Sequence, residues 1–306
     1  MRLRNSIGCA VIALVLVGCA TTLTVPSVQV DGVPFYTQAD LQCGPAALAS
    51  LLYSAGLPQP VPTLSKWMFT PGLGGALQQD LLGAARRAGA LPVRIAPYLA
   101  ALHAQLAHGR PVLVLENLAL PRWPHWHYAV VTAINANADT VMLGGPSGVA
   151  EAASARQFLR AWQFAEGWGI VVLKPGDNPS GLLAKDYIDA VASLEAIGEI
   201  NAAGLGYDAG LRQWPQEPDL YFGAGNIALT RGQLELAAHH FLQVLALRPQ
   251  EAGALNNLAD VRRQQGALTE AAQLAQRALQ LAVDAPLRSA VLDTLRQISS
   301  CGAHCK

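Results

Sequence analysis

One cysteine opens a helix-forming run in the stretch Gln38-Ala39-Asp40-Leu41-Gln42-Cys43-Gly44-Pro45-Ala46-Ala47-Leu48. Proline is tolerated in a first helical turn, where its missing N–H would have no partner, so the stretch predicts a helix that begins near Cys43 and ends at Gly56. The unpaired N–H groups and the positive end of the helix dipole would favour the thiolate, which is the nucleophilic form. The alternative interpretation of Cys43 is a buried structural thiol, because free cysteine often packs as a small hydrophobe.

The composition is that of a globular protein. Of the 306 residues, 52% are hydrophobic and 14% are charged, and the formal net charge is zero. The length suggests about two domains, each with its own core. Because no part of the chain is strongly basic, we expect no nucleic-acid partner.

The N-terminus carries a targeting pattern. Arg2 and Arg4 precede an apolar run over 7–17, which overlaps the sequence Leu16-Val17-Gly18-Cys19. Residues 1–19 resemble bacterial lipoprotein signal peptides, and the resemblance implies cleavage before Cys19 and lipidation of its thiol. Ala20 follows in place of Asp, which in that family implies the outer membrane, facing the periplasm. An ordinary N-terminal membrane anchor is the alternative.

The next part of the chain predicts a mixed domain of helices and strands. Residues 20–32 are expected to form a tether, 33–174 the first domain and 175–183 a linker rich in Pro and Gly. Within the domain, apolar patterns predict helices over 76–88, 97–108 and 154–164 and strands over 111–116, 127–134, 140–143 and 168–173. The continuous apolar run of 111–116 is typical of a strand that is covered on both faces.

A cysteine nucleophile needs a base, and His127 is the best of the seven histidines. It begins an apolar strand directly after a loop, where a rigid element can hold an imidazole at the edge of a cleft. His125 would face the same side of an extended strand, but no third ligand with matching spacing accompanies the pair. The sequence therefore predicts no metal site, and it contains no pattern typical of a cofactor.

Two segments together carry a family resemblance. Gln38 with Cys43-Gly44-Pro45-Ala46-Ala47-Leu48, and the later His127-Tyr128-Ala129-Val130-Val131, resemble the papain-like bacteriocin-processing cysteine peptidases, which cleave leader peptides after paired glycines. The resemblance covers about residues 33–174. It implies an α+β papain-like fold, with Cys43 as nucleophile, His127 as base and Gln38 as a donor in the oxyanion hole.

The third catalytic residue is where the sequence departs from that family. The family places an Asp after the histidine strand to orient the imidazole, whereas this chain has Gly144-Gly145-Pro146-Ser147 there. Asn117, at the end of the preceding strand, is the candidate for the orienting role. Asn135, Asp139 and Ser147 are poorer candidates. Loss of an orienting group typically lowers the rate by orders of magnitude without abolishing catalysis.

The C-terminal part of the sequence is periodic. Three sets of identical residues recur with a period of 34. The glycines are Gly198, Gly232 and Gly266, the alanines are Ala203, Ala237 and Ala271, and the prolines are Pro215 and Pro249. This pattern resembles the tetratricopeptide family, which implies three helical hairpins stacked into an all-α superhelix over 184–299, including a capping helix over 286–299. Residues 300–306 are expected to form a tail. A disulfide between Cys301 and Cys305 is one possibility there, and a metal pair or two free thiols are the others.

Three functions compete at this stage. The first is a lipid-anchored cysteine peptidase that cleaves a peptide bond, with repeats that bind its peptide or protein substrate. The second is a catalytically weak or inactive peptidase-like scaffold whose repeats recruit a protein partner. The third is a cell-wall amidase or acyl transferase, which also uses Cys and His in a papain-like fold. Cys43-Gly44-Pro45 differs from the usual surroundings of the cysteine in that last class.

Overall fold

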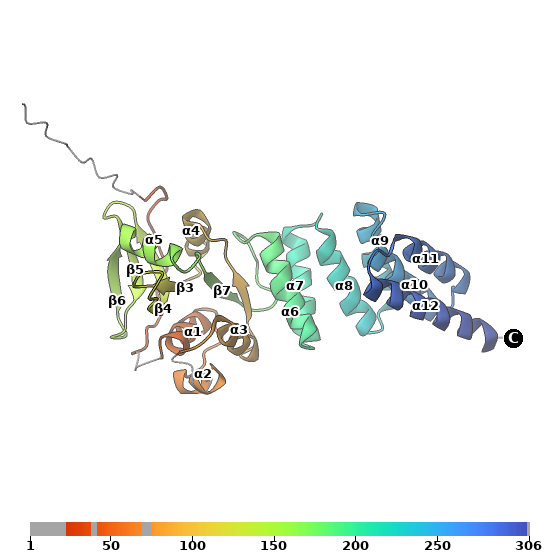
Figure 1. Cartoon of the computed structure of the whole chain (residues 1–306), viewed down its shortest axis with the longest axis horizontal. Helices are drawn as coiled ribbons and strands as arrows, with labels where there is room; N and C mark the ends of the chain where they lie inside the picture. The colour runs from red at the N-terminus through yellow and green to blue at the C-terminus, as the bar shows by residue number, and fades with distance from the viewer. Residues whose placement is uncertain (1–22, 38–41, 69–74, 305–306) are drawn as a thin grey trace, which may run out of the picture.

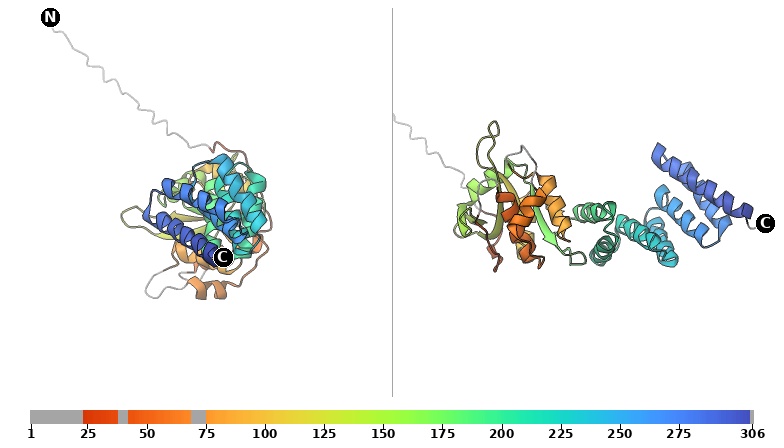
Figure 2. Two further views of the ribbon diagram at one scale, coloured as in Figure 1. Left: turned by 90° about the vertical axis from the view of Figure 1, so that its right-hand side faces the viewer. Right: turned by 90° about the horizontal axis from the view of Figure 1, so that it is seen from below.

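A computed structural model describes residues 23–37, 42–68 and 75–304 of the chain. A domain built on a β-sheet comes first, and a row of helical hairpins extends away from it (Figure 1, and the right view of Figure 2). The expected signal peptide with Cys19, the expected oxyanion donor Gln38 and the tail residue Cys305 lie outside the described residues.

The first domain contains an antiparallel sheet, which has seven strands within the described residues. The strands are β1 (Val28–Gln29), β2 (Leu91–Arg94), β3 (Val112–Asn117), β4 (Trp126–Asn135), β5 (Thr140–Gly144), β6 (Ala150–Ser154) and β7 (Gly169–Leu173). Their order across the sheet is β2-β7-β3-β4-β5-β6, and β1 pairs with β4. All six residues of the central strand β3 are buried, which confirms the prediction of a strand covered on both faces.

Helices cover both faces of this sheet, as Figure 1 shows. One face packs against α1 (Cys43–Ser54), α2 (Val61–Met68) and α3 (Gln78–Arg87), and the other packs against α4 (Leu99–Ala107) and α5 (Ala155–Gln163). Along β3, Leu113 and Leu115 belong to the core under α1, whereas Val112 and Val114 belong to the core on the opposite face. This alternation follows from the two-residue period of a strand, and it assigns a face to each residue of β3 and of β4 from Trp126 to Val131, before the irregularity that lies between Val131 and Ala133.

The second part of the structure consists of helical hairpins. Its helices are α6 (Ala184–Ala196), α7 (Ile200–Gln213), α8 (Pro218–Thr230), α9 (Leu234–Leu247), α10 (Ala252–Gln264), α11 (Leu268–Leu281) and α12 (Ala285–His304). Gly198, Gly232 and Gly266 each lie at the turn inside a hairpin with φ near +70 to +84°, which is a conformation that a side chain disfavours. The equivalent alanines Ala203, Ala237 and Ala271 are fully buried, as expected where two helices approach closely.

The end of the chain differs from the sequence prediction. Residues 300–304 continue α12 and do not form a separate tail. The apolar residues Val291 and Ile298 of α12 are buried in the last helical core, so this helix covers α10 and α11 as a cap. None of the helices in the described ranges is long and apolar enough to cross a membrane.

The two parts of the molecule share one core. α6 packs against the edge strand β2, and its residues Tyr187, Val191 and Leu194 belong to the same buried cluster as Val93. The linker is also held down, because Gln105 donates a hydrogen bond of 2.6 Å from Nε2 to the carbonyl oxygen of Gly181. The repeats are therefore docked on the first domain and are not suspended from a free linker.

Candidate functional site

Cys43 is the first residue of α1 and is half-buried. The residue before it, Gln42, makes no side-chain capping bond to the helix, and the first turn contains no acidic residue. The thiol therefore lies beside a helix N-terminus whose amide groups have no capping side chain within the described residues. This is the placement that the sequence predicts for a nucleophilic cysteine.

His127 lies on β4, but the structure does not bring it to Cys43. The neighbouring Tyr128 packs under α1, because its ring carbon Cδ2 lies 3.3 Å from the place where a Cβ on Gly44 would be. Since consecutive side chains on a strand point to opposite faces, the imidazole of His127 points away from α1. Among the described residues, no hydrogen bond joins Cys43 and His127.

The surroundings of His127 are consistent with that orientation. Burial lowers the pKa of His127, the charge of His125 lowers it further, and the charge of Glu151 on β6 acts in the opposite direction. Glu151 itself accepts a hydrogen bond of 3.2 Å from the hydroxyl of Ser147. The carboxylate that acts on His127 therefore comes from a strand that the sequence analysis did not predict.

Asn117 braces a loop in the structure. Its Oδ1 accepts hydrogen bonds from the amides of Ala119 (3.1 Å) and His125 (3.0 Å), and these bonds hold the two sides of the β3–β4 loop together. In the strand register Asn117 lies opposite Trp126, the neighbour of His127. Residues paired across two strands share a face of the sheet and consecutive residues alternate, so the side chains of Asn117 and His127 point to opposite faces. These contacts do not support an orienting role for Asn117 toward His127. Its Nδ2 is buried without a hydrogen-bond partner.

Glu116 is the residue that lies directly opposite His127 on the neighbouring strand. It is 3% exposed, and burial raises the pKa of its carboxyl to about 7. Glu116 was not among the residues predicted for the site. The sequence signal that points to it is an acidic residue inside an apolar run that is otherwise typical of a strand covered on both faces.

The other described cysteine has a simpler position. Cys301 is a free thiol, half-buried on α12. In the described ranges, no group of three or more His, Cys, Asp or Glu side chains is placed to hold a metal ion.

A polar row crosses the first helices of three successive hairpins. Asn226 on α8 donates from Nδ2 to Oε1 of Glu195 on α6 (3.3 Å), and its Oδ1 accepts a bond of 2.9 Å from Nδ2 of Asn257 on α10. The hydroxyl of Tyr207 on α7 donates a hydrogen bond of 2.7 Å to Oε2 of Glu195. At the far end of the row, Asn256 donates to Oδ1 of Asn257 (3.4 Å), and its own Oδ1 is buried without a partner. We call Glu195, Asn226, Asn257 and Asn256 the polar row.

Comparison with known proteins identifies the helices that carry most of this row. Residues 222–286 match the family model described as the tetratricopeptide repeat. The C-terminal part of the chain is a tetratricopeptide-repeat region. The match covers most of α8 and all of α9 to α11, and the hairpin of α6 and α7 continues the same architecture toward the sheet domain.

Two solved structures are similar to this repeat region. One is the first tetratricopeptide domain of Spaghetti (RPAP3) bound to the HSP90 peptide SRMEEVD, with 20% sequence identity, a TM-score of 0.36 and coverage of 39% of this chain and 93% of that chain. The other is the type III secretion translocator chaperone SycD of Yersinia enterocolitica, with 20% identity, a TM-score of 0.36 and coverage of 39% and 85%. A search of curated proteins finds no matching sequence.

Proposed function

We propose that this protein is a lipid-anchored scaffold that binds a polypeptide partner through its tetratricopeptide-repeat region. The single observation that carries the proposal is the polar row, which ends in the buried and unpartnered Oδ1 of Asn256. A buried acceptor without a hydrogen bond costs free energy, and a ligand that supplies a donor removes this cost. The backbone N–H groups of an extended peptide are donors of this kind.

The chemistry of the row suits a peptide backbone. Asparagine side chains both donate and accept hydrogen bonds, as peptide groups do, so a line of them can pair with successive amides. Glu195 gives one end of the row a negative charge, while the other end is neutral. Stacked hairpins form an extended surface along which such a line of contacts can continue.

A binding experiment tests this proposal. Peptides selected from a displayed library against the purified protein would be measured by fluorescence anisotropy with the wild type and with Asn256→Ala and Asn257→Ala. We expect each variant to weaken binding by about fivefold, since one net hydrogen bond contributes on the order of 1 kcal/mol. Gln273→Ala, on the exposed face of α11, is the matched control and should bind as the wild type does. Equal affinities for all the proteins would refute the role of the row.

The lipid anchor is a separate part of the proposal, supported by the pattern Leu16-Val17-Gly18-Cys19. Cys19→Ser should prevent lipidation, so that the protein leaves the membrane fraction or stays unprocessed. Mass spectrometry of the N-terminus, together with membrane fractionation, measures this. An unchanged mass and an unchanged membrane fraction would contradict the anchor.

A cysteine peptidase on a papain-like domain is the second candidate function, and the position of Cys43 at the start of α1 favours it. The orientation of His127 counts against it, because a base must reach the thiol to activate it. The two functions are separated by the rate of Cys43 alkylation as a function of pH, with Cys301→Ser present to remove the other described thiol. If His127 is the base, His127→Ala should remove the fast reaction at mildly acidic pH. If the profiles of the two proteins coincide, His127 has no such role.

A further inference from the structure

Four exposed apolar side chains gather where β3 passes into β4. They are Leu118, Leu120, Trp123 and Trp126, and their exposed fractions range from 52% to 70%. The four other tryptophans of the chain are buried or half-buried. Both views of Figure 2 show the segment between β3 and β4 projecting away from the sheet domain. Large apolar side chains that are exposed together mark a binding surface. We call residues 118–126 the arm.

The arm is a hairpin with an ordered backbone. At its tip, the amide of Trp123 donates a hydrogen bond of 3.0 Å to the carbonyl of Leu120, and the two residues form a β-bridge. At its base, the amide of Leu118 donates to the carbonyl of His125 at 2.9 Å, and Asn117 holds both sides through its Oδ1. The apolar side chains are therefore presented in the folded protein without a partner having to order the arm.

The backbone of the arm has few free donors. Pro121 and Pro124 have no N–H group. The amides that donate hydrogen bonds inside the arm or to Asn117 are those of Leu118, Ala119, Trp123 and His125. Moving an unbonded N–H out of water costs free energy, so these internal bonds lower the cost of placing the arm in a lipid boundary. A loop that binds a polypeptide by strand pairing would instead keep its donors free.

The charge of the arm also suits a lipid surface. The segment 117–126 contains no Asp or Glu, and its charged side chain is Arg122, in the turn at the tip. Anionic headgroups attract such a cation, and an arginine side chain is long enough to reach back to them from a deeper position. Tryptophan concentrates at the level of the headgroups, because its ring is apolar and its N–H is polar.

We propose that the arm inserts into the surface of an anionic lipid bilayer, with Leu120 and Trp123 in the upper part of the acyl chains and the guanidinium of Arg122 among the headgroups. The insertion adds a second contact with the membrane to the proposed lipid anchor, and it is separate from peptide binding by the repeats. An arm of this size buries a small apolar area, so it binds weakly alone and gains from any attachment that already holds the protein at the membrane.

The arm and the start of the described chain lie at opposite ends of β4. The amide of Leu23 donates a hydrogen bond of 3.2 Å to Oδ1 of Asp139, next to the end of β4, whereas the arm precedes its start. β4 has ten residues, so the two places are about 30 Å apart. A bilayer that holds both the N-terminal lipid and the arm therefore runs along β4. This orientation rests on the proposed lipid anchor, but the insertion of the arm does not.

Bromine atoms on lipid acyl chains quench tryptophan fluorescence at short range, so they report on the arm itself. The purified full-length protein would be mixed with vesicles of phosphatidylcholine and phosphatidylglycerol, with and without dibrominated acyl chains. We expect the emission of the wild type to be lower in the brominated vesicles. Trp123→Phe combined with Trp126→Phe should remove most of that difference, because phenylalanine keeps the apolar contact without the signal. Trp214→Phe, in the repeat region, is the matched control and should leave the difference unchanged.

Leu120→Asp tests insertion itself. Because Leu120 is exposed, the variant should fold as the wild type does, and the bromine quenching of its tryptophans should be lost. Val283→Asp makes a similar change in the exposed turn between α11 and α12 and should leave the quenching intact.

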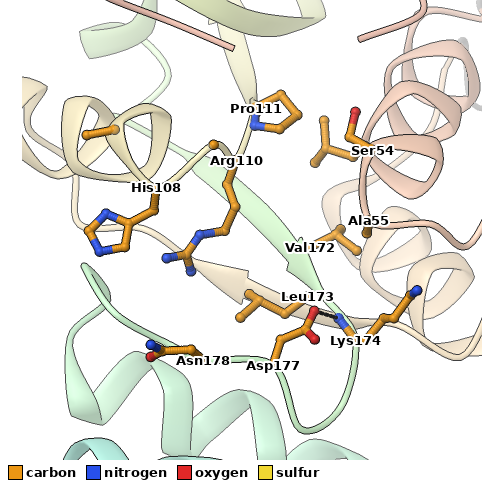
Figure 3. A pocket seen from close by; sticks show the side chains of 13 residues that line it. Ser54, Ala55, His108, Arg110, Pro111, Val172, Leu173, Lys174, Asp177 and Asn178 are labelled. Atoms are coloured by element: carbon orange, nitrogen blue, oxygen red, sulfur yellow. Dashed lines mark hydrogen bonds between the residues drawn. The ribbon is translucent and has the colours of Figure 1, made fainter. Parts of the chain in front are cut away.

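A tryptophan placed elsewhere on the sheet domain is a second control. Ser54 is exposed at the end of α1, beside a cavity of about 510 Å³ whose lining contains no residue of the arm (Figure 3). Ser54→Trp, added to the double phenylalanine variant, should raise the emission without restoring the quenching.

Three results would overturn the proposal. They are an equal emission of the wild type in brominated and plain vesicles, undiminished quenching in Leu120→Asp, and a wild-type dimer in analytical ultracentrifugation that Leu120→Asp dissociates, since the arm would then bind a second copy of the chain. Vesicle flotation measures the lipid anchor independently. Protein that floats with the vesicles without bromine quenching would keep the anchor and refute the arm.

Discussion

Gly223 on α8 offers a direct test of how the repeat helices pack. A Cβ at this position would lie 2.1 Å from Cζ and 2.2 Å from Cε1 of Tyr207 on α7. The ring of Tyr207 is 2% exposed, and its hydroxyl is bonded to Glu195 at 2.7 Å. The ring therefore cannot retreat without breaking the bond that fixes the polar row. We expect Gly223→Ala to destabilise the fold.

The size of the effect is a difference of two terms. Alanine is favoured over glycine inside a helix by about 1 kcal/mol. Forcing a methyl group into a filled core costs about 1–3 kcal/mol, and the 2.1 Å contact with a fixed aromatic ring places this site at the upper end. The net loss in the free energy of unfolding should therefore be about 2 kcal/mol.

Urea unfolding followed by circular dichroism at 222 nm measures this loss. Gly204→Ala on α7 is the matched control, since the three atoms nearest to its Cβ would all belong to the guanidinium of Arg231, the closest at 3.0 Å, and that flexible end can shift. The control should be as stable as the wild type or more so. A Gly223→Ala protein that is also as stable as the wild type would refute the close approach of α8 to Tyr207, and with it the geometry assigned to Glu195.

Three further predictions concern single positions. Ala271→Arg should unfold the repeat region and reduce the helical circular dichroism signal, because Ala271 is 0% exposed and a buried unpaired charge costs several kcal/mol. Gln273→Arg, at an exposed position of the same helix, should fold normally. Burial raises the pKa of Glu116 from its ordinary 4.5 to about 7, so the stability that this group contributes is full below pH 4.5 and is lost as the pH rises through 7. The Tm of the wild type should therefore fall between pH 5 and pH 8, and Glu116→Gln should remove most of that fall. Asn117→Ala should increase hydrogen exchange at the amides of Ala119 and His125, whose acceptor it removes, and unchanged protection would show that other contacts order this loop.

The elements that the sequence predicted well are those with a strong local signal. The apolar run of 111–116 forms β3, and the glycines spaced by 34 residues lie at the turns of the helical hairpins. The strands β1, β2 and β6 were not predicted, and β1 lies within the segment 20–32 that was expected to be a tether. β2 contains Pro92 within four residues, and β6 is rich in alanine and mostly exposed, so both form because a neighbouring strand pairs with them and not because of their own propensity.

The candidate site shows where sequence reasoning stops. The start of α1 at Cys43 follows from local residue preferences, and the sequence predicted it correctly. His127 was correctly expected at the start of a strand, but the face to which it points depends on the register between β3 and β4. A shift of one residue reverses every side chain on a strand, and the sequence carries no direct record of that register. The same register brings Glu116 opposite His127, which no spacing in the sequence indicated.

α6 connects the sheet domain to the polar row. It carries Ser193, whose hydroxyl accepts a hydrogen bond of 3.0 Å from Arg86 of the sheet domain, and two residues later it carries Glu195, the first member of the polar row. Its buried face shares a core with β2. A single rigid helix thus belongs both to the docking interface and to the proposed peptide-binding surface. Because Ser193 and Glu195 lie on one helix, a partner bound along the row, as proposed above, would be held at a fixed place relative to the sheet domain and Cys43.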